Sequence, residues 1–238
     1  MGKNLLQQRR GKGSPTFRAP SFRYIGQVNL KSVSEQTFRG SVVELLHSQG
    51  HNAPIARIVY DDGEEVLSAA PLGIRIGDNV FTGKDSELKD GNTLPLSKIP
   101  EGTVIFNLEA RPGDGGKFVR SSGGSARVVA RLADKIMVEL PSRKQRPFDP
   151  QCRATIGTIA GGGRLEKPLL KAGGMYHRAR ARNRRYPHVC ALSMNAVDHP
   201  FGGSRSSKKG KSTIAPRFAP PGRKVGKIRP SRTGRRRS

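Results

Sequence analysis

The chain has 238 residues, 34% of them hydrophobic and 5% aromatic, with a formal net charge of +26. So few apolar residues can fill one or two small barrels, but not a single globule of this length. The sequence offers no run of about 20 apolar residues to span a membrane and no apolar signal-peptide core at its N-terminus. Its two cysteines are too few for a disulfide scaffold. We therefore expect a protein of the reducing cytoplasm that does not enter a membrane.

Residues 1–34 are predicted to form a basic N-terminal extension. They contain seven Lys or Arg residues and no acidic residue. Like charges at this density repel one another, so we expect the extension to have no compact fold of its own until a polyanion neutralises it.

Residues 35–84 are predicted to form a small β-barrel. Short apolar stretches recur there with turn residues between them, and Asp61-Asp62-Gly63 marks a tight hairpin between two of the stretches. Four short strands within about 45 residues are typical of a barrel of the OB type. The expected strands are 41–47, 55–60, 64–70 and 78–83.

Residues 85–170 are predicted to form a second small barrel. A connector rich in Pro and Gly at 91–102 separates it from the first set of strands. Asp134-Lys135 joins two apolar stretches so closely that a hairpin is expected. No long helix is expected in the chain, although residues 175–185 can form a short basic one. The expected strands are 103–110, 117–120, 126–133, 135–140 and 152–160.

Residues 171–238 are predicted to form a basic C-terminal extension. They contain nineteen Lys or Arg residues and a single acidic residue, Asp198, whereas residues 35–170 contain eighteen basic and seventeen acidic residues. A nearly neutral body therefore carries two strongly cationic extensions. Extensions of this length and composition predict a nucleic acid as the partner.

Two patterns invite a nucleotide or metal interpretation, and neither satisfies it. Gly210-Lys211-Ser212 resembles the end of a phosphate-binding loop, but Arg205 stands where the first glycine belongs and no strand precedes it. His188, Cys190 and His199 lack the spacing of a zinc site. We therefore predict no nucleotide hydrolysis, no metal and no cofactor.

The glycine-rich stretches 111–118 and 160–163 have two compatible interpretations. Glycine permits the positive φ angles that tight turns require. Glycine also allows the backbone to approach a phosphate chain closely, here helped by Lys117, Arg120 and Arg164. The sequence leaves both interpretations open.

The stretch SMNAVDHPFGG at 193–203 places Asp198 beside His199, as in acid–base catalysis. Adjacent side chains of an extended segment point to opposite sides, so these two would not naturally bond to each other. The strongly basic flanking residues are unsuited to building a water-excluding pocket alone. We therefore predict no enzyme, and instead a loop that follows an RNA surface, in which Asp198 accepts hydrogen bonds from bases, 2′-hydroxyls or arginines.

Several motifs along nearly the whole chain carry a family resemblance. They are QQRRGKGSPTFRAPSFRY, RPGDGGKFVRSSGGSA, CRATIGTI, KAGG, MNAVDHPFGG and APPGRKVGKI. Together they resemble the universal large-subunit ribosomal protein family L-two. The N-terminal tail, the alanine of MNAVDHP and the phenylalanine of HPFGG resemble its archaeal and eukaryotic branch. Cys190-Ala191 departs from the family pattern, so no family role is assigned to it. The segment SRSSKKGKS departs from the bacterial pattern, so no bacterial contact is expected there, although a basic, flexible segment still is.

The resemblance implies a mainly β fold, with an OB-fold RNA-binding domain at 35–84, an SH3-like barrel at 85–170 and long basic extensions. It implies a structural constituent of the large ribosomal subunit, monomeric within the ribosome. The implied partners are large-subunit rRNA, neighbouring ribosomal proteins and, at an intersubunit contact, the small subunit. It further implies support for subunit association, for tRNA binding and for the architecture of the peptidyl transferase region.

The resemblance also implies site residues. A loop near the peptidyl transferase region would contain Asn195, Asp198, His199, Gly202 and Gly203, with His199 supporting RNA structure rather than transferring protons. The residues expected to contact rRNA are Arg9, Arg10, Lys12, Arg18, Arg23, Lys117, Arg120, Arg153, Lys171, Arg178, Arg180, Arg182, Arg184, Arg185, Arg223 and Lys224.

Two alternative functions share the basic composition. A non-ribosomal RNA chaperone would lack one fixed binding site, and salt washing would release it from large subunits. A protein that compacts nucleic acid should carry a recognition helix or minor-groove arms, whereas this sequence predicts small barrels.

Overall fold

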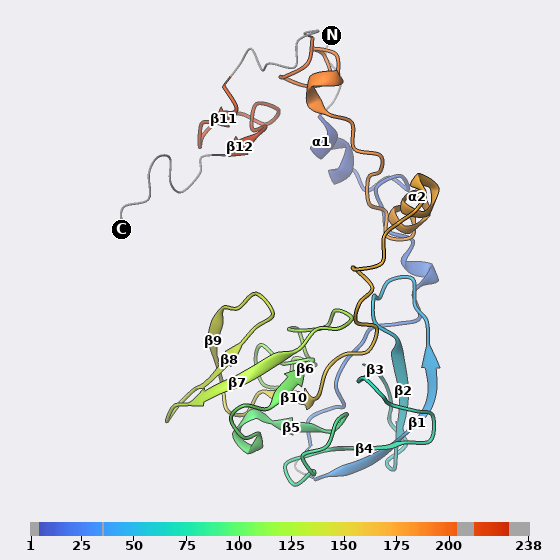
Figure 1. Cartoon of the computed structure of the whole chain (residues 1–238), viewed down its shortest axis with the longest axis vertical. Coiled ribbons are helices and arrows are strands. Elements are labelled where there is room, and N and C mark those ends of the chain that lie inside the picture. The colour runs from blue at the N-terminus through green and yellow to red at the C-terminus, as the bar shows by residue number, and fades with distance from the viewer. Residues whose placement is uncertain (1–4, 35, 204–211, 229–238) are drawn as a thin grey trace. The chain divides into compact units, whose positions relative to one another are not determined.

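A computed structural model describes residues 5–34, 36–203 and 212–228 of the chain. The described residues fall into two compact units. The strand unit comprises residues 21–170, and the extension unit comprises the residues before and after it, up to residue 20 and from residue 171. Strands predominate in the first unit, and two short helices and connecting loops in the second (Figure 1).

Ten strands of the strand unit form one mixed sheet, in the order β3-β2-β1-β4-β5-β10-β6-β7-β8-β9. All neighbours are antiparallel except β4 and β5, which run parallel and are joined at Thr82 and Thr93. The strands are β1 (Phe38–Leu46), β2 (Ile55–Tyr60), β3 (Glu65–Ala69), β4 (Asn79–Thr82), β5 (Thr93–Pro95), β6 (Val104–Phe106), β7 (Ala126–Arg131), β8 (Ile136–Glu139), β9 (Gln145–Phe148) and β10 (Arg153–Ile156).

The first four strands match the four that the sequence predicts between residues 35 and 84. Alternating apolar residues of β1 and β2 point inward, as expected for strands with one buried face. The turn between β2 and β3 is made by Gly63, whose φ of +83° favours glycine. The buried apolar side chains of this set are Val42, Ala56, Ile58, Tyr60, Val66, Ala70 and Val80.

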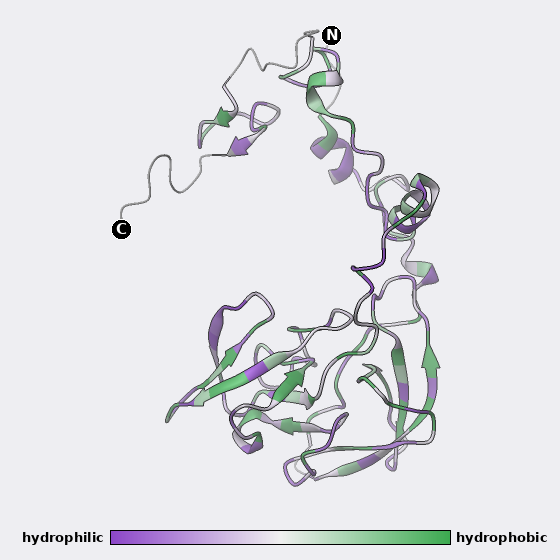
Figure 2. Cartoon of the chain, viewed as in Figure 1, coloured by the Kyte–Doolittle hydropathy of each residue, from purple (hydrophilic) through white to green (hydrophobic). Residues whose placement is uncertain are grey.

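A separate apolar cluster lies among β5 to β10. It includes Leu94, Ile105, Val128 and Val138, all almost fully buried. Figure 2 shows the hydrophobic colour along β6, whereas β9 is mostly hydrophilic. The second strand set predicted from the sequence is therefore present, with a core of its own.

Two details of the second strand set differ from the sequence prediction. No strand forms at 117–120 within the described chain, because Val119 has a φ of +53°, outside the range of a strand. Phe118 makes only an isolated bridge with Leu108. The sequence analysis missed β5 and β9, which are short, and β9 contains Pro147, tolerated because this strand is an edge of the sheet.

Residues 21–34 belong to the strand unit, although the sequence analysis placed them in the N-terminal extension. Val28 and Leu30 are buried, and the Asn29 amide donates to the Leu67 carbonyl of edge strand β3 at 2.9 Å. Lys31 is buried as well and pairs with Asp62 and Glu64. The sequence analysis assigned this segment from its summed charge. That sum does not reveal the buried apolar residues, nor the acidic partners of Lys31, which lie about thirty residues further along the chain.

The extension unit contains short elements only. They are α1 (Leu6–Gly11), α2 (Ala172–Arg180), a 3₁₀ turn at Ala191–Ser193, and the parallel pair β11 (Ile214–Ala215) and β12 (Lys227–Ile228). The helix α2 begins and ends a few residues earlier than the sequence predicts. No helix in the described residues is long and apolar enough to cross a membrane.

Candidate nucleic-acid interface

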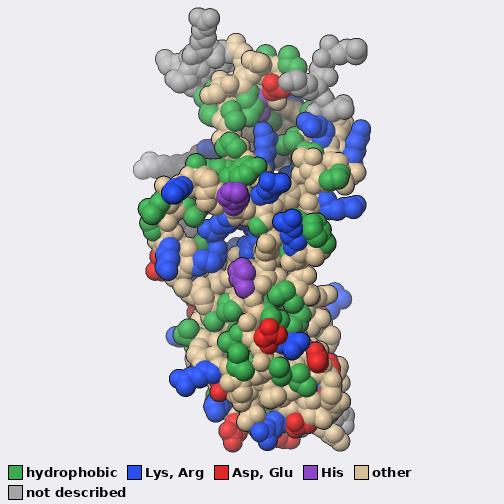
Figure 3. Space-filling model, turned by 90° about the vertical axis from the view of Figure 1, so that its right-hand side faces the viewer, with side chains coloured by type: hydrophobic (Ala, Val, Ile, Leu, Met, Phe, Trp, Pro, Cys, Tyr) green, Lys and Arg blue, Asp and Glu red, His purple; other side chains and the backbone are tan. Residues whose placement is uncertain are grey.

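Basic side chains dominate the extension unit. Figure 3 shows Lys and Arg side chains over the extension residues that it displays, while Asp and Glu side chains gather mainly over the strand-rich part. Of the sixteen basic residues expected to contact RNA, thirteen are exposed and three are half-buried: Arg120, Arg153 and Arg182. The exposed ones are Arg9, Arg10, Lys12, Arg18, Arg23, Lys117, Lys171, Arg178, Arg180, Arg184, Arg185, Arg223 and Lys224.

Two of the half-buried arginines hold the protein itself together. Arg120 donates to the backbone carbonyl of Val28 at 2.5 Å, and burial lowers the pKa of its guanidinium. Arg153 donates to Glu109 at 2.7 Å and to the backbone carbonyl of Lys31 at 2.7 Å. Both arginines thus attach residues 28–31 to the second strand set.

Glu109 is the centre of this attachment, and the sequence analysis did not single it out. Its side chain is fully buried, and its carboxylate accepts hydrogen bonds from the backbone and side chain of Arg153 and from the Gly115 amide. The signal available in the sequence was an acidic residue next to a strongly apolar stretch. Only the fold brings Arg153 to it.

The glycine-rich stretches form turns that pack within the strand unit. In the first, the Asp114 carboxylate accepts from the backbone amides of Ala110 and Gly116. A Cβ on Gly116 would lie 2.9 Å from the Asn107 carbonyl. In the second, a Cβ on Gly123 would lie 2.7 Å from the Cα of Gly162, so two backbone segments touch there. These contacts support the turn interpretation at both stretches.

Residues 194–203 close into a compact loop through backbone hydrogen bonds. The Asn195 carbonyl accepts from the amides of Asp198 at 2.9 Å and His199 at 3.2 Å. The Gly203 amide donates to the Met194 carbonyl at 3.1 Å and so joins the two ends. Asn195 and Asp198 are exposed and His199 is half-buried. The five residues expected at this site therefore lie in one loop.

The imidazole of His199 is held by the backbone of its own loop. Its Nδ1 accepts a hydrogen bond from the Phe201 amide at 3.1 Å, and the two rings lie 5.2 Å apart between centroids. Nδ1 is therefore unprotonated, and Nε2 carries the hydrogen that the ring can donate. In the Ser-His-Asp triad, by contrast, it is Nδ1–H that donates to a carboxylate. The hydrogen bond from Phe201 thus fixes the orientation of the His199 ring within the loop.

Both glycines of the loop are required by the loop itself. A Cβ on Gly202 would lie 2.5 Å from the Asn195 carbonyl oxygen. Gly203 has a φ of +90°, and its Cβ would lie 2.8 Å from that of Ala196. Side chains at these positions would open the loop before any RNA contact is considered.

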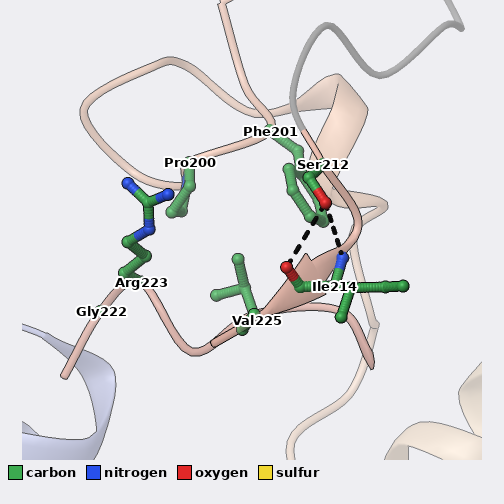
Figure 4. A pocket seen from close by; sticks show the side chains of 8 residues that line it. Pro200, Phe201, Ser212, Ile214, Gly222, Arg223 and Val225 are labelled. Atoms are coloured by element: carbon green, nitrogen blue, oxygen red, sulfur yellow. Dashed lines mark hydrogen bonds between the residues drawn. The ribbon is translucent and has the colours of Figure 1, made fainter. Parts of the chain in front are cut away.

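The loop and the motif at 219–228 form one substructure. A Cβ on Gly226 would lie 3.3 Å from the Phe201 ring, and the Lys227 amide donates to the Thr213 carbonyl at 2.8 Å. Between them is a cavity of about 500 Å³, drawn in Figure 4, in which Pro200 and Phe201 lie across from Val225. Arg223 lies on its wall. Two motifs about twenty residues apart in sequence are thus brought together.

The described residues cover the phosphate-loop and metal patterns of the sequence only in part. Gly210, Lys211 and Arg205 lie outside the described residues. Within the described residues, no group of three or more His, Cys, Asp or Glu side chains is placed to hold a metal ion. Cys152 is buried, and burial raises the pKa of its thiol to about 11, so it is not a thiolate at neutral pH.

Comparisons with known proteins agree with the resemblance carried by the motifs. The family described as Ribosomal Proteins L2, C-terminal domain, matches residues 89–220. Large ribosomal subunit protein uL2 of Methanothermobacter thermautotrophicus is 49% identical over 241 residues, covering 100% of both chains. The protein of the same name from Methanopyrus kandleri is 50% identical over 239 residues, covering 99% of this chain and 98% of the relative.

A third relative extends the archaeal series. The uL2 protein of Halorubrum lacusprofundi is 49% identical over 236 residues, covering 99% of this chain and 98% of its own. These archaeal relatives span nearly the whole chain and confirm the family predicted from the sequence motifs. This chain belongs to the uL2 family of large ribosomal subunit proteins.

Proposed function

We propose that this chain is a structural constituent of the large ribosomal subunit that binds large-subunit rRNA and is not an enzyme. The observation that carries the proposal is identity of about half over the full length of proteins named for that subunit. The charge distribution supports it independently, because nineteen basic residues against one acidic residue in 171–238 require a polyanion.

We infer a division of the strand unit into an OB-fold RNA-binding domain at 35–84 and an SH3-like barrel at 85–170. Two of the three buried apolar clusters found in the described residues, one within each strand set, support this division. So does the sheet, in which a single parallel residue pair joins β4 to β5. The third cluster, which contains Ile55, Ala69 and Phe106, lies across the two sets. Residues 1–34 and 171–238 are the basic extensions of this scheme, with 21–34 packed on the strands.

The rRNA contacts of the proposal are the thirteen exposed basic residues named above and the half-buried Arg182. Arg120 and Arg153 take a supporting part, since their donors are largely used inside the protein. The loop at 194–203 would lie near the peptidyl transferase region, with the Nε2–H of His199 donating to RNA and Asp198 accepting from it. Contacts to neighbouring proteins and to the small subunit, and support for tRNA binding, complete the proposal.

The experiment is cosedimentation followed by crosslinking. The full chain should stay with purified large subunits through a high-salt wash, and ultraviolet crosslinking should attach it to a fixed set of rRNA nucleotides. Release by salt together with scattered crosslinks would identify an RNA chaperone instead. Catalytic turnover by the free chain would contradict the part of the proposal that the protein is not an enzyme.

A further inference from the structure

The hairpin formed by β8 and β9 carries a basic tip on a body that is otherwise close to neutral. Residues 140–148 contain three basic residues and no acidic residue, whereas residues 35–170 as a whole contain eighteen basic and seventeen acidic residues. The three are Arg143, Lys144 and Arg146, and all of them are exposed. They lie outside the motifs that carry the family resemblance. The hairpin therefore concentrates positive charge at one place in the strand unit.

Backbone hydrogen bonds close the tip of this hairpin. The Arg143 amide donates to the Leu140 carbonyl at 2.8 Å, and the Leu140 amide donates to the Lys144 carbonyl at 3.0 Å. Arg143 has a φ of +60°, the left-handed conformation common at the end of a short hairpin loop. β9 pairs with β8 and is the last strand of the ten-stranded sheet (Figure 1). The basic side chains thus stand at the edge of the sheet, on a backbone that the turn fixes.

The guanidinium of Arg146 lies over two aromatic rings. Its Cζ is 4.8 Å from the centroid of the Phe118 ring and 5.5 Å from that of the Phe148 ring. The two rings meet edge to face, with their centroids 5.3 Å apart, and Phe148 is almost fully buried. A cation over an aromatic ring is attracted by the negative face of that ring. The guanidinium of Arg146 is therefore held in place, although its side chain remains exposed.

The strand register explains how Arg146 reaches these rings. Arg146 lies opposite Val138 of β8, and Phe148 lies opposite Ile136. Val138, Ile136 and Phe148 all belong to the apolar cluster of the second strand set. Side chains two residues apart in a strand share a face, so Arg146 lies on the core face of β9, next to the hairpin tip.

A guanidinium held in this way is suited to binding a phosphate group. Contact with aromatic rings engages the face of a guanidinium, whereas its N–H donors point outward in its plane and match two phosphate oxygens. A side chain that is already oriented loses less conformational entropy when it binds. Lys144 lies two residues before Arg146 and adds a second positive charge beside it. The hairpin tip therefore suits a chain of phosphates.

We propose that Arg146, held over Phe118 and Phe148, binds a phosphate of the large-subunit rRNA backbone, and that Lys144 contacts a neighbouring phosphate. The inference rests on the proposed function and adds to it a contact in the strand unit that the family motifs do not contain. Exposed charges on an edge strand can also serve to prevent its pairing with another chain. The two roles differ in what a neutral replacement changes, which is rRNA binding in one case and self-association in the other.

The test compares single substitutions of equal charge in the full-length chain. Arg146→Met keeps an apolar side chain against the two rings but removes the charge and the donors, and Lys144→Met removes the second charge. The matched control is Lys135→Met, an exposed position at the opposite end of β8 from the hairpin tip. Binding to full-length large-subunit rRNA is measured against salt concentration. The slope of log affinity against log salt should become shallower by about 1 for each hairpin variant, and by less for the control.

Ethylation interference on the same complexes locates the contact. Ethylation of one rRNA phosphate should weaken binding of the unsubstituted chain and of the control, and should make no difference to binding of Arg146→Met. Denaturant unfolding shows whether each variant is folded. If Arg146→Met is not, the slope and the interference pattern of Lys144→Met decide, because a substitution at that exposed position has little effect on stability.

Slopes and interference patterns of the folded hairpin variants that equal those of the control would overturn the inference and leave the proposed function standing. Hairpin variants that bind rRNA as the control does but self-associate would also overturn it, and would assign the charges to protection of the edge strand. Failure of the unsubstituted chain to bind rRNA would overturn the proposed function itself.

Discussion

In the strand unit the buried charges are paired within the protein, whereas the extension unit has almost no acidic residue to pair with. Lys31 finds Asp62 and Glu64, and Arg153 finds the fully buried Glu109. Residues 171–238 contain nineteen basic residues and only Asp198 as an acid. The difference teaches that one unit can fold on its own contacts, while the other needs an external polyanion to offset its repulsion.

The largest expected effect comes from breaking the buried pair of the strand unit. Glu109→Ala leaves Arg153 without its carboxylate, and breaking a buried pair in this way costs about 3–5 kcal/mol of folding free energy. Denaturant unfolding of the full chain measures the loss. Glu65→Ala, at an exposed position, is the matched control and should change stability by less than about 0.5 kcal/mol. Equal losses for both would contradict the role of Glu109.

A glycine substitution in the extension unit tests whether the two units are stable independently of each other. Gly202→Val places a side chain against the Asn195 carbonyl and should open the loop at 194–203. We expect unchanged unfolding of the strand unit but a several-fold lower occupancy in reconstituted large subunits. Gly173→Ala is the control, since its Cβ would meet nothing within 4 Å. A loss of strand-unit stability on Gly202→Val would show that the units are not independent.

The next effect concerns His199. Removing its fixed Nε2 donor by His199→Ala should cost the roughly 1–3 kcal/mol of an unsatisfied RNA partner and appear as poor assembly. His199→Gln retains hydrogen-bonding capacity without a titrating ring, so it should be partly tolerated. Peptide-bond formation is measured on subunits confirmed to contain the Gln variant. A loss of several orders of magnitude at normal occupancy and unchanged footprint would instead indicate proton transfer.

The smallest effect is a pH dependence of the strand unit. The hydrogen bond from Lys31 lowers the pKa of Asp62. Burial alone would raise the pKa of Glu64, but its hydrogen bonds from Lys31 and Ser32 outweigh burial, so this pKa is lowered too. Their contribution is present above the ordinary carboxyl pKa values, about 4, and is lost as pH falls through the lower folded values. Asp62→Asn should weaken this acid dependence of unfolding between pH 5 and pH 2, whereas Asp134→Asn should leave it unchanged.

At alkaline pH the contribution of the same cluster to stability changes with pH in the opposite direction. Burial alone would lower the pKa of Lys31, but its hydrogen bonds to Asp62 and Glu64 raise it above the ordinary value. The contribution of Lys31 is therefore present at neutral pH and lost only as pH rises beyond that value. The free energy of unfolding of the Asp62→Asn variant is compared with that of the unsubstituted chain across the pH range. The same pH dependence in both would show that the pair contributes nothing to stability.

The sequence predicted the strands better than the contacts between them. The Asp-Gly turn and the short apolar stretches between turn residues placed β1 to β4 correctly, because these signals are local. Val119 at positive φ and the edge strand with Pro147 were missed, since their conformations depend on packing. For the same reason, charge counting could not place Lys31 in the core.

In the loop at 194–203, too, the sequence predicted local features but not the contacts that depend on packing. Its membership was predicted from the motif. The tautomer of His199 was not predicted, because it depends on the Phe201 amide folding back onto Nδ1. The packing of Phe201 near Gly226 was not predicted either, because no periodic pattern in the sequence indicates that these two segments meet.

Hydrogen exchange on the full chain, free and within large subunits, tests the contrast between the two units most directly. Amides of residues 21–170 should be protected in both states. Amides of residues 5–20 and 171–203 should exchange rapidly in the free chain and become protected only when rRNA is bound. Strong protection of α2 and the loop at 194–203 in the free chain would contradict the account, because the extension unit would then fold without its polyanion.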